Sequence, residues 1–337
     1  MTSVLLVEDE VPVAKAMQRW LEPGDFAVRR VASAEEAIEQ MADDPAAVVV
    51  CDVGLPGRDG VWLARELTEK YPQSAVVLAT GSASVPPVVS LRKGVVAYLV
   101  KPFQREQLRS AIDQGLDWVA RETEHRARIE TLEREVCERR QALVARFAAL
   151  PMRSPRDVRL ALERLYSADL LEHADRVSSL SDGVGARLGL SARDGEALAL
   201  AGQIHEIGRL VMPASLLGKR DPLTHAERLL LERAPVETHA LLHRHETLAP
   251  AAELILTMRE RFGGFGYPRG LCADEIPLSA RILGAADAYD TMLRERPGRP
   301  ALSPGEAAME MMRTAGGQFD PRVVYAMFEA LDASTTH

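Results

Sequence analysis

Residues 48–60 read VVVCDVGLPGRDG, in which an apolar run ends at Asp52. Four further runs of four to six residues, rich in valine and leucine, occur before residue 120, with segments of helical period between them. Strands without polar alternation are typical of a parallel sheet that is buried on both faces. The pattern therefore predicts a doubly wound α/β domain with five parallel strands. The five runs are Val4–Val7, Phe26–Val31, Ala47–Cys51, Ala75–Ala79 and Val96–Val100.

Composition excludes several classes of function. The chain has 337 residues, 47% of them hydrophobic, which suits two globular domains of roughly 150 residues each. A net charge of -8 and only 5% aromatic residues argue against binding to DNA or to an anionic membrane surface. No apolar run approaches the roughly 20 residues of a spanning helix, and the N-terminus does not resemble a signal peptide. Three scattered cysteines without a CxxC pair predict a cytoplasmic protein without disulfides.

A charged helical segment follows the predicted α/β domain. Residues 121–146 contain no glycine or proline and mix both charge signs. Part of an a/d seam is apolar, and two arginines fall where the seam would continue. The segment is either a solvated helix or, as we prefer, a short parallel coiled coil that pairs two copies into a homodimer. The seam residues are Ile129, Leu132, Val136 and Leu143, with Arg139 and Arg146.

The rest of the chain has helical patterns and no convincing strand. We therefore predict an α/β domain over 1–120, a helical linker over 121–150 and an all-α domain over 151–337. Pro151 and Pro155 end the linker helix. Helices are expected over about 157–188, 192–206, 224–244, 250–261, 278–294, 304–314 and 321–331.

Polar residues stand where the predicted strands end. Glu8 and Asp9 follow the first run, Asp52 the third, Thr80 the fourth and Lys101 the fifth. The carboxyl ends of parallel strands meet at one edge of a sheet, so these side chains should converge. Three close carboxylates repel one another, and Mg²⁺ would relieve that repulsion. Asp52 would then act as a nucleophile toward a phosphoryl group, whose charge Mg²⁺ and Lys101 would offset. Taken singly, each residue has an ordinary role as a helix cap, a loop residue or a solvated lysine.

Residues 3–120 resemble the receiver domain of two-component response regulators. The resemblance is carried by VEDE (7–10), CDVGLPGRDG (51–60), LATGS (78–82) and YLVKPF (98–103). It implies that Asp52 accepts phosphate from a partner histidine kinase. It also implies a switch in which Tyr98 turns inward as Thr80 moves toward the phosphate beside Lys101. The implied ligands of Mg²⁺ are Glu8, Asp9, Asp52 and a backbone carbonyl near Gly54.

Several helices of the all-α region carry histidines and carboxylates. Asp169 and His173 share a helix face, IHEIGR (204–209) contains His205 and Glu206, and Asp287 lies in an otherwise apolar helix. Buried histidines and carboxylates from separate helices can converge on a metal. Each of them can equally be a hydrogen-bonded core histidine, a helix cap or one half of an ion pair.

Residues 165–330 resemble the HD-GYP family, a branch of the HD phosphohydrolases. Members hydrolyse cyclic di-GMP and often follow a receiver domain. The resemblance rests on MPASLLGKRDPLT (212–224), GFGYPRGL (264–271), EIPLSARILGAADAYD (275–290) and GGQFDPRVVYAMF (316–328). It implies a GYP loop at Gly266, Tyr267 and Pro268, and potential metal ligands at Asp169, His173, His205, Glu206 and Asp287.

This sequence departs from the HD-GYP pattern at the metal ligands. The paired His-Asp is His205-Glu206, and the longer glutamate shifts its carboxylate by about 1.5 Å. Ala234, Met258 and Arg259 stand at three positions where the family has histidines, and Arg209 replaces a lysine. The remaining residues outline at most one metal position, whereas hydrolysis in a two-metal site needs both ions. Arg259 places a positive charge where a cation belonged, which either repels metal or holds a phosphate.

Two functions compete for the helical domain. The first is a pseudoenzyme, gated by phosphorylation of the receiver, that binds a partner protein or a nucleotide such as cyclic di-GMP. Its GYP loop would then contact a partner such as a diguanylate cyclase domain. The second is a divergent cyclic di-GMP phosphodiesterase with one or two metals. His239, His243 and His245 are alternative ligands, but their charge-rich stretch favours a solvated helix surface.

Overall fold

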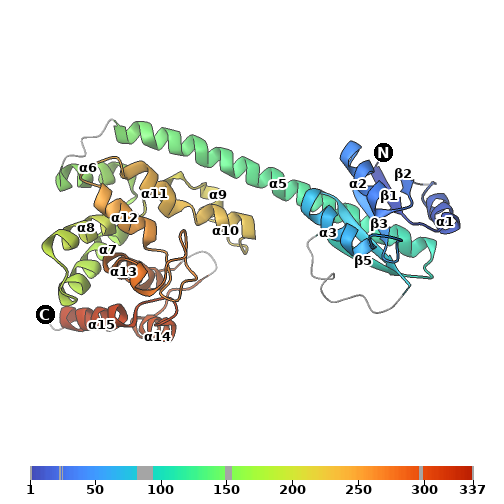
Figure 1. The fold of residues 1–337 in the computed structure, drawn as a ribbon. Coiled ribbons are helices and arrows are strands. Elements are labelled where there is room, and N and C mark those ends of the chain that lie inside the picture. Colours follow the sequence, from blue (N-terminus) through green and yellow to red (C-terminus); the bar gives the residue numbers. More distant parts are fainter. Residues whose placement is uncertain are drawn as a thin grey trace. The chain divides into compact units, whose positions relative to one another are not determined.

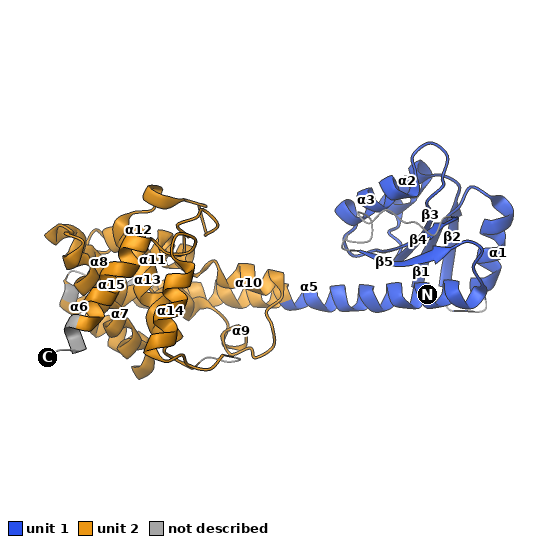
Figure 2. Ribbon diagram, turned by 90° about the horizontal axis from the view of Figure 1, so that it is seen from below, with its two compact units in different colours: residues 1–128 blue, residues 129–337 orange. Residues whose placement is uncertain are grey.

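The computed structural model describes residues 2–22, 24, 26–81, 94–148, 154–295 and 299–335 (Figure 1). The chain divides into two compact units, Met1–Arg128 and Ile129–His337 (Figure 2). Within the described ranges, no helix combines the length and apolar character that crossing a membrane requires.

The first unit is a five-stranded parallel sheet in the order β2-β1-β3-β4-β5. This confirms the predicted doubly wound α/β fold, and each predicted run forms a strand. The prediction that every strand is buried on both faces is wrong for β2 and β5, which are partly exposed because each has a neighbour on one side only. The strands are β1 (Thr2–Val7), β2 (Phe26–Val31), β3 (Val48–Asp52), β4 (Ala75–Thr80) and β5 (Val95–Val100).

Helices cover both faces of this sheet because successive strand residues point to opposite sides. Val49 and Cys51 of β3 pack in one cluster with α2 and α3, while Val48 and Val50 pack in the other with α1 and α5. Packing of helices on both faces of the sheet thereby holds the strands, and the residues at their ends, in place. The helices are α1 (Val11–Leu21), α2 (Ala34–Asp43), α3 (Gly60–Lys70) and α5 (Arg105–Ala148).

Helix α5 is one continuous helix of 44 residues that includes most of the predicted linker. The apolar seam of this helix is buried within the chain and is not accessible to a second copy of the protein. Leu132, Val136 and Leu143 are at most 5% exposed and belong to the hydrophobic core of the second unit, with Ile129 packed against it. A coiled coil through these residues would have to expose that core, so they do not support the expected homodimer. Pro151 lies outside the described residues.

The second unit is built of helices, and two of the predicted helices are broken. The first break lies at Tyr166 and Ser167, where the Ser167 hydroxyl accepts a hydrogen bond from the Leu170 N–H and starts α7. The second lies between α10 and α11, where Pro235 stands in the first turn of α11. The helices are α6 (Pro155–Leu165), α7 (Ala168–Arg187), α8 (Ala192–Ile204), η1 (Ile207–Val211), α9 (Ala214–Leu217), α10 (His225–Leu231), α11 (Ala234–Leu242), α12 (Ala249–Thr257), η2 (Ala273–Glu275), α13 (Leu278–Met292), α14 (Pro304–Thr314) and α15 (Pro321–Thr335).

Candidate functional site

The receiver unit brings its acidic residues together at one edge of the sheet. Oxygen atoms of Glu8, Asp9 and Asp52 lie within 4.8 Å of one another. The Lys101 Nζ atom donates hydrogen bonds to Asp52 Oδ2 at 2.9 Å and to Glu8 Oε2 at 2.7 Å. Burial raises the pKa of Glu8, and the hydrogen bond from Lys101 opposes that rise. Three carboxylates with one ammonium fit Mg²⁺, for which oxygen atoms are the preferred ligands.

Local backbone geometry positions Asp52 at the end of β3. The Gly54 N–H donates to Asp52 Oδ1 at 3.2 Å. A Cβ atom at Gly60 would lie only 2.1 Å from the Asp52 carbonyl oxygen, so the start of α3 can approach the strand only with glycine there. Glycine at position 60 therefore lets α3 begin close to the end of β3, where Asp52 lies.

The two predicted switch residues lie on neighbouring strands. Thr80 ends β4 and is buried, and its carbonyl oxygen accepts a hydrogen bond from the Lys101 N–H. Tyr98 lies on β5 opposite Leu78, and its ring packs against the cluster formed by α2 and α3. Its hydroxyl is buried and has no hydrogen-bond partner among the described residues.

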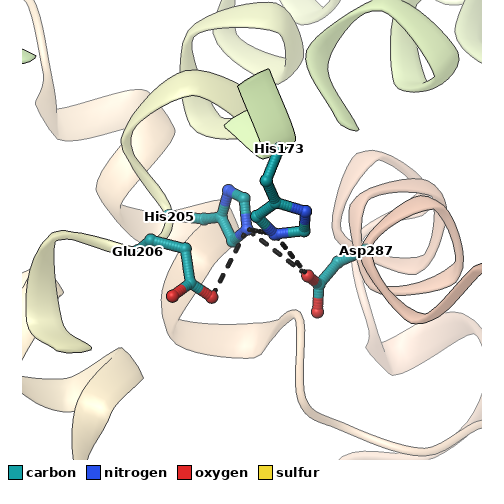
Figure 3. A group of neighbouring side chains, drawn as sticks. All are labelled: His173, His205, Glu206 and Asp287. Atoms are coloured by element: carbon teal, nitrogen blue, oxygen red, sulfur yellow. Dashed lines mark hydrogen bonds and ion pairs between the residues drawn. The ribbon is translucent and has the colours of Figure 1, made fainter. Parts of the chain in front are cut away.

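The helical unit brings four of its predicted ligands into one buried cluster, shown in Figure 3. His173 comes from α7, His205 and Glu206 follow α8, and Asp287 lies on α13. Asp287 Oδ1 is 3.2 Å from His173 Nε2 and 3.4 Å from His205 Nε2. The two Nε2 atoms are 3.2 Å apart, and His205 Nε2 is 3.7 Å from Glu206 Oε1.

These spacings fit a single divalent ion. Four ligand atoms at about 2.0–2.2 Å from a tetrahedral ion lie about 3.3–3.6 Å from one another. Asp287 is only 1% exposed, and neither of its carboxylate oxygens has a well-aligned hydrogen-bond donor among the described residues. Imidazole nitrogens together with carboxylate oxygens suit zinc, manganese or iron. Two imidazoles and two carboxylates would hold such an ion.

A second layer of polar groups turns both imidazoles toward the centre of the cluster. His173 Nδ1 is 2.6 Å from Asp290 Oδ2, and Arg176 holds the other Asp290 oxygen. His205 Nδ1 is 2.7 Å from the Gly202 carbonyl oxygen. Contacts of this kind fix the ring orientation of metal-binding histidines. Burial lowers the pKa of His173, but its contacts with Asp287 and Asp290 outweigh burial and raise that pKa to about 9.

Two arginines pair with the carboxylates of the cluster. Arg259 Nη2 lies 2.8 Å from Asp287 Oδ2, and Arg209 Nη1 lies 3.1 Å from Glu206 Oε2. Burial would raise the pKa of Asp287, yet Arg259 and the two imidazoles hold it well below its usual value. The predicted positive charge at Arg259 therefore lies directly beside Asp287, one of the candidate metal ligands.

Two cavities open beside the cluster. One, of about 380 Å³, is lined by His205 and Glu206 together with Ala234, Met258 and Arg259, the three positions predicted to lack a histidine of the HD-GYP pattern. The other, of about 460 Å³, includes His173 and Arg139 of α5. Arg209, Met212 and Leu217 border both cavities, so the two adjoin each other.

The predicted ligand Asp169 does not join the cluster. It is exposed near the start of α7 and lines the larger cavity. The spacing of Asp169 and His173 placed them on one helix face but did not show how deeply each is buried. Asp290, to which sequence reasoning gave no role, contacts His173 from α13 instead. The available signal was its place one turn after Asp287.

Tyr267 of the GYP loop lines the smaller cavity. The buried Glu260 carboxylate accepts hydrogen bonds from the Arg269 and Leu271 N–H groups and so holds the loop. A Cβ atom at Gly266 would lie 2.3 Å from the Arg261 nitrogen, which accounts for glycine in this close turn.

The alternative histidines lie elsewhere. His239 Nε2 is 2.7 Å from Glu253 Oε1, and its ring stacks on that of His243, which is exposed. Among the described residues, the groups able to hold a metal include neither of them, nor His245.

Comparison with known proteins identifies both units. A family model of the response regulator receiver domain matches residues 4–113, and a model of the HD domain matches residues 161–323. The chain is a response regulator that joins a receiver domain to an HD domain. The recognition of both families from sequence is thereby confirmed.

Two relatives of this receiver–HD response regulator match along most of their length. The cyclic di-GMP phosphodiesterase response regulator RpfG of Xanthomonas campestris is 29% identical over 83% of this chain and 74% of its own. A cyclic di-GMP phosphodiesterase of Thermotoga maritima is 27% identical over 97% of this chain and 90% of its own. A solved CheY-like receiver domain from Methanospirillum hungatei is 26% identical over 36% of this chain and 98% of its own, with a TM-score of 0.35.

Proposed function

We propose that the protein is phosphorylated on Asp52 by a histidine kinase. We further propose that its HD domain transmits the signal by binding a partner or a cyclic dinucleotide rather than by hydrolysis. The observation that carries the second part is the Arg259 guanidinium, 2.8 Å from Asp287. A cytoplasmic location belongs to the same proposal, which the three free cysteines support.

The receiver part of the proposal is supported by the contacts around Asp52. The carboxylate lies beside Glu8 and Asp9, which would hold Mg²⁺, and beside the Lys101 ammonium. Mg²⁺ supplies charge that neutralises phosphoryl oxygens when it is bound. Lys101 would release its contact with Glu8 and hold a phosphoryl oxygen instead. The phosphate would thereby favour one of two packings of Thr80 and Tyr98.

The HD part is supported by the ligands that are absent. Hydrolysis in a two-metal site uses one ion to generate hydroxide and a second to stabilise the leaving oxygen. Ala234 and Met258, which line the smaller cavity with His205 and Glu206, offer no oxygen or nitrogen ligand from their side chains. Because both relatives are named as cyclic di-GMP phosphodiesterases, a cyclic dinucleotide is the ligand class we propose for the cavities.

A phosphodiesterase with a single metal is the second candidate. The observation that favours it is the set of four donors spaced for one ion, two of them oriented imidazoles. One ion could generate hydroxide, and a positively charged side chain would then have to stabilise the leaving group.

Turnover of cyclic di-GMP separates these two functions. We expect that wild-type protein loaded with Mn²⁺ or Fe²⁺ leaves cyclic di-GMP unhydrolysed after long incubation, with or without acetyl phosphate. Chromatography of the nucleotide measures the result. The physical reason is that the cluster offers no ligands for a second metal ion to stabilise the leaving oxygen. If the wild type forms the linear hydrolysis product and His205→Ala does not, the non-catalytic function is refuted and the second candidate is established.

The GYP loop offers a surface for a partner protein. Phe265, directly before Gly266 of the loop, is 88% exposed, and exposed aromatic residues are favoured at protein interfaces. We expect Phe265→Ser to weaken binding to a diguanylate cyclase domain by at least about tenfold in calorimetry, since a buried aromatic anchor contributes about 2 kcal/mol or more. Tyr325→Ser, at another exposed aromatic residue on α15, is the matched control. Equal affinity in Phe265→Ser and wild type would remove the loop from the proposal.

A further inference from the structure

Arg259 holds an unusual position for an arginine. Its guanidinium contacts a carboxylate that is only 1% exposed, and about a third of its side chain is exposed, at 36%. It borders the cavity that also contains His205 and Glu206. The Asp287 carboxylate raises the pKa of Arg259 further, so the guanidinium is charged at every ordinary pH.

The two oxygens of Asp287 face different cations. Oδ1 is within 3.4 Å of both histidine Nε2 atoms, where one divalent ion fits, while Oδ2 lies 2.8 Å from Arg259 Nη2. In two-metal sites the ions are about 3.5–4 Å apart, close enough for one carboxylate to contact both. Here the guanidinium occupies the side of Asp287 on which a second ion would lie.

Charge explains why a cation is needed at that place. Burying a carboxylate without a charged partner costs several kcal/mol of folding free energy. A metal ion at this place would need further ligand side chains, whereas the Arg259 guanidinium needs none because it is part of the chain. A guanidinium has five N–H donors, more than Asp287 Oδ2 can accept. Donors therefore remain for an anionic oxygen in the adjoining cavity.

We propose that Arg259 is a tethered cation that takes the place of a second metal ion. The site then holds one divalent ion, bound by His173, His205, Glu206 and Asp287, and a phosphodiester oxygen is held by Arg259 beside it. This inference rests on the proposed function, because it assumes that the HD cavity binds a phosphodiester.

Binding of Co²⁺ to the full-length protein tests this assignment. Four-coordinate Co²⁺ with imidazole ligands absorbs visible light strongly, whereas an all-oxygen receiver site absorbs weakly, so absorbance reports the HD site alone. We expect one Co²⁺ per chain at this site in the wild type. Arg259→Ala should bind Co²⁺ at least about tenfold more tightly, because a positive charge close to the ion is removed. Arg259→Lys, which keeps that charge, should stay close to the wild type.

Arg261→Ala is the matched control, since Arg261 is an exposed arginine two residues away. It should change Co²⁺ affinity by less than about twofold. With Co²⁺ bound, Arg259→Ala should also bind cyclic di-GMP at least about tenfold more weakly, which corresponds to loss of one charged contact. Unchanged or weaker Co²⁺ binding in Arg259→Ala, or two Co²⁺ ions in the wild-type HD site, would overturn the assignment. Turnover of cyclic di-GMP by the wild type would instead refute the proposed function and leave this assignment standing.

Discussion

Asp52→Asn abolishes the mass gain of one phosphoryl group that we expect when wild-type protein is incubated with acetyl phosphate and Mg²⁺. In the proposed reaction the carboxylate is the attacking group, and a neutral amide has neither its nucleophilicity nor its charge for Mg²⁺. Because Lys101 contacts both Asp52 and Glu8, the substitution leaves the ammonium paired and should preserve the fold. Intact-protein mass spectrometry under non-acidic conditions measures the result.

Asp59→Asn is the matched control for this substitution. Asp59 is the N-cap of α3, where its side chain accepts a hydrogen bond from the Trp62 N–H, and asparagine caps helices equally well. This variant should gain a phosphoryl group as the wild type does. An equal mass gain in Asp52→Asn would mean that another residue accepts the phosphate.

Gly208→Ala should cost the HD unit about 3 kcal/mol of unfolding free energy. A Cβ atom at this position would lie 2.0 Å from the Ala234 carbonyl oxygen and 2.4 Å from Thr238 Oγ1. The Gly208 N–H also donates to Thr238 Oγ1 at 2.8 Å, so η1 cannot move away from α11 without losing that bond. Overpacking against backbone typically costs 1–3 kcal/mol. The calorimetric melting temperature of this unit should fall by about 6–12 °C.

The control places the same substitution where space is open. Gly195 lies in α8, and a Cβ atom there would meet nothing within 4 Å. Gly195→Ala should leave stability unchanged or raise it by up to about 1 kcal/mol, because alanine favours a helix over glycine. A melting temperature of Gly208→Ala within 2 °C of the wild type, about the shift of a 1 kcal/mol change, would show that η1 and α11 are less closely packed than described.

The receiver fold and its pocket could be predicted because the apolar runs that form the strands also determine where the polar residues after them meet. Buried runs such as those ending at Asp52 and Thr80 have one stable arrangement, a parallel sheet whose carboxyl ends meet. The approach of Glu8, Asp52 and Lys101 follows directly from that arrangement. Motif order likewise predicted that His205, Glu206 and Asp287 belong to one domain.

Other features depend on contacts that sequence spacing does not contain. The seam of α5 was expected to face a second copy, because heptad spacing shows that Leu132 and Val136 share a face but not what covers it. Asp290 contacts and orients His173, although the two residues are 117 positions apart in the sequence. The break at Ser167 was missed because a single serine within a helical pattern is ordinary unless its side chain is seen to cap.

The number of cations in the HD unit tests the central claim most directly. Crystals of the full-length protein grown with Mn²⁺ should give one peak in the anomalous scattering map among His173, His205, Glu206 and Asp287. The guanidinium of Arg259 should remain beside Asp287. Two peaks about 3.5–4 Å apart, with Arg259 displaced, would show a complete two-metal centre and contradict the non-catalytic account.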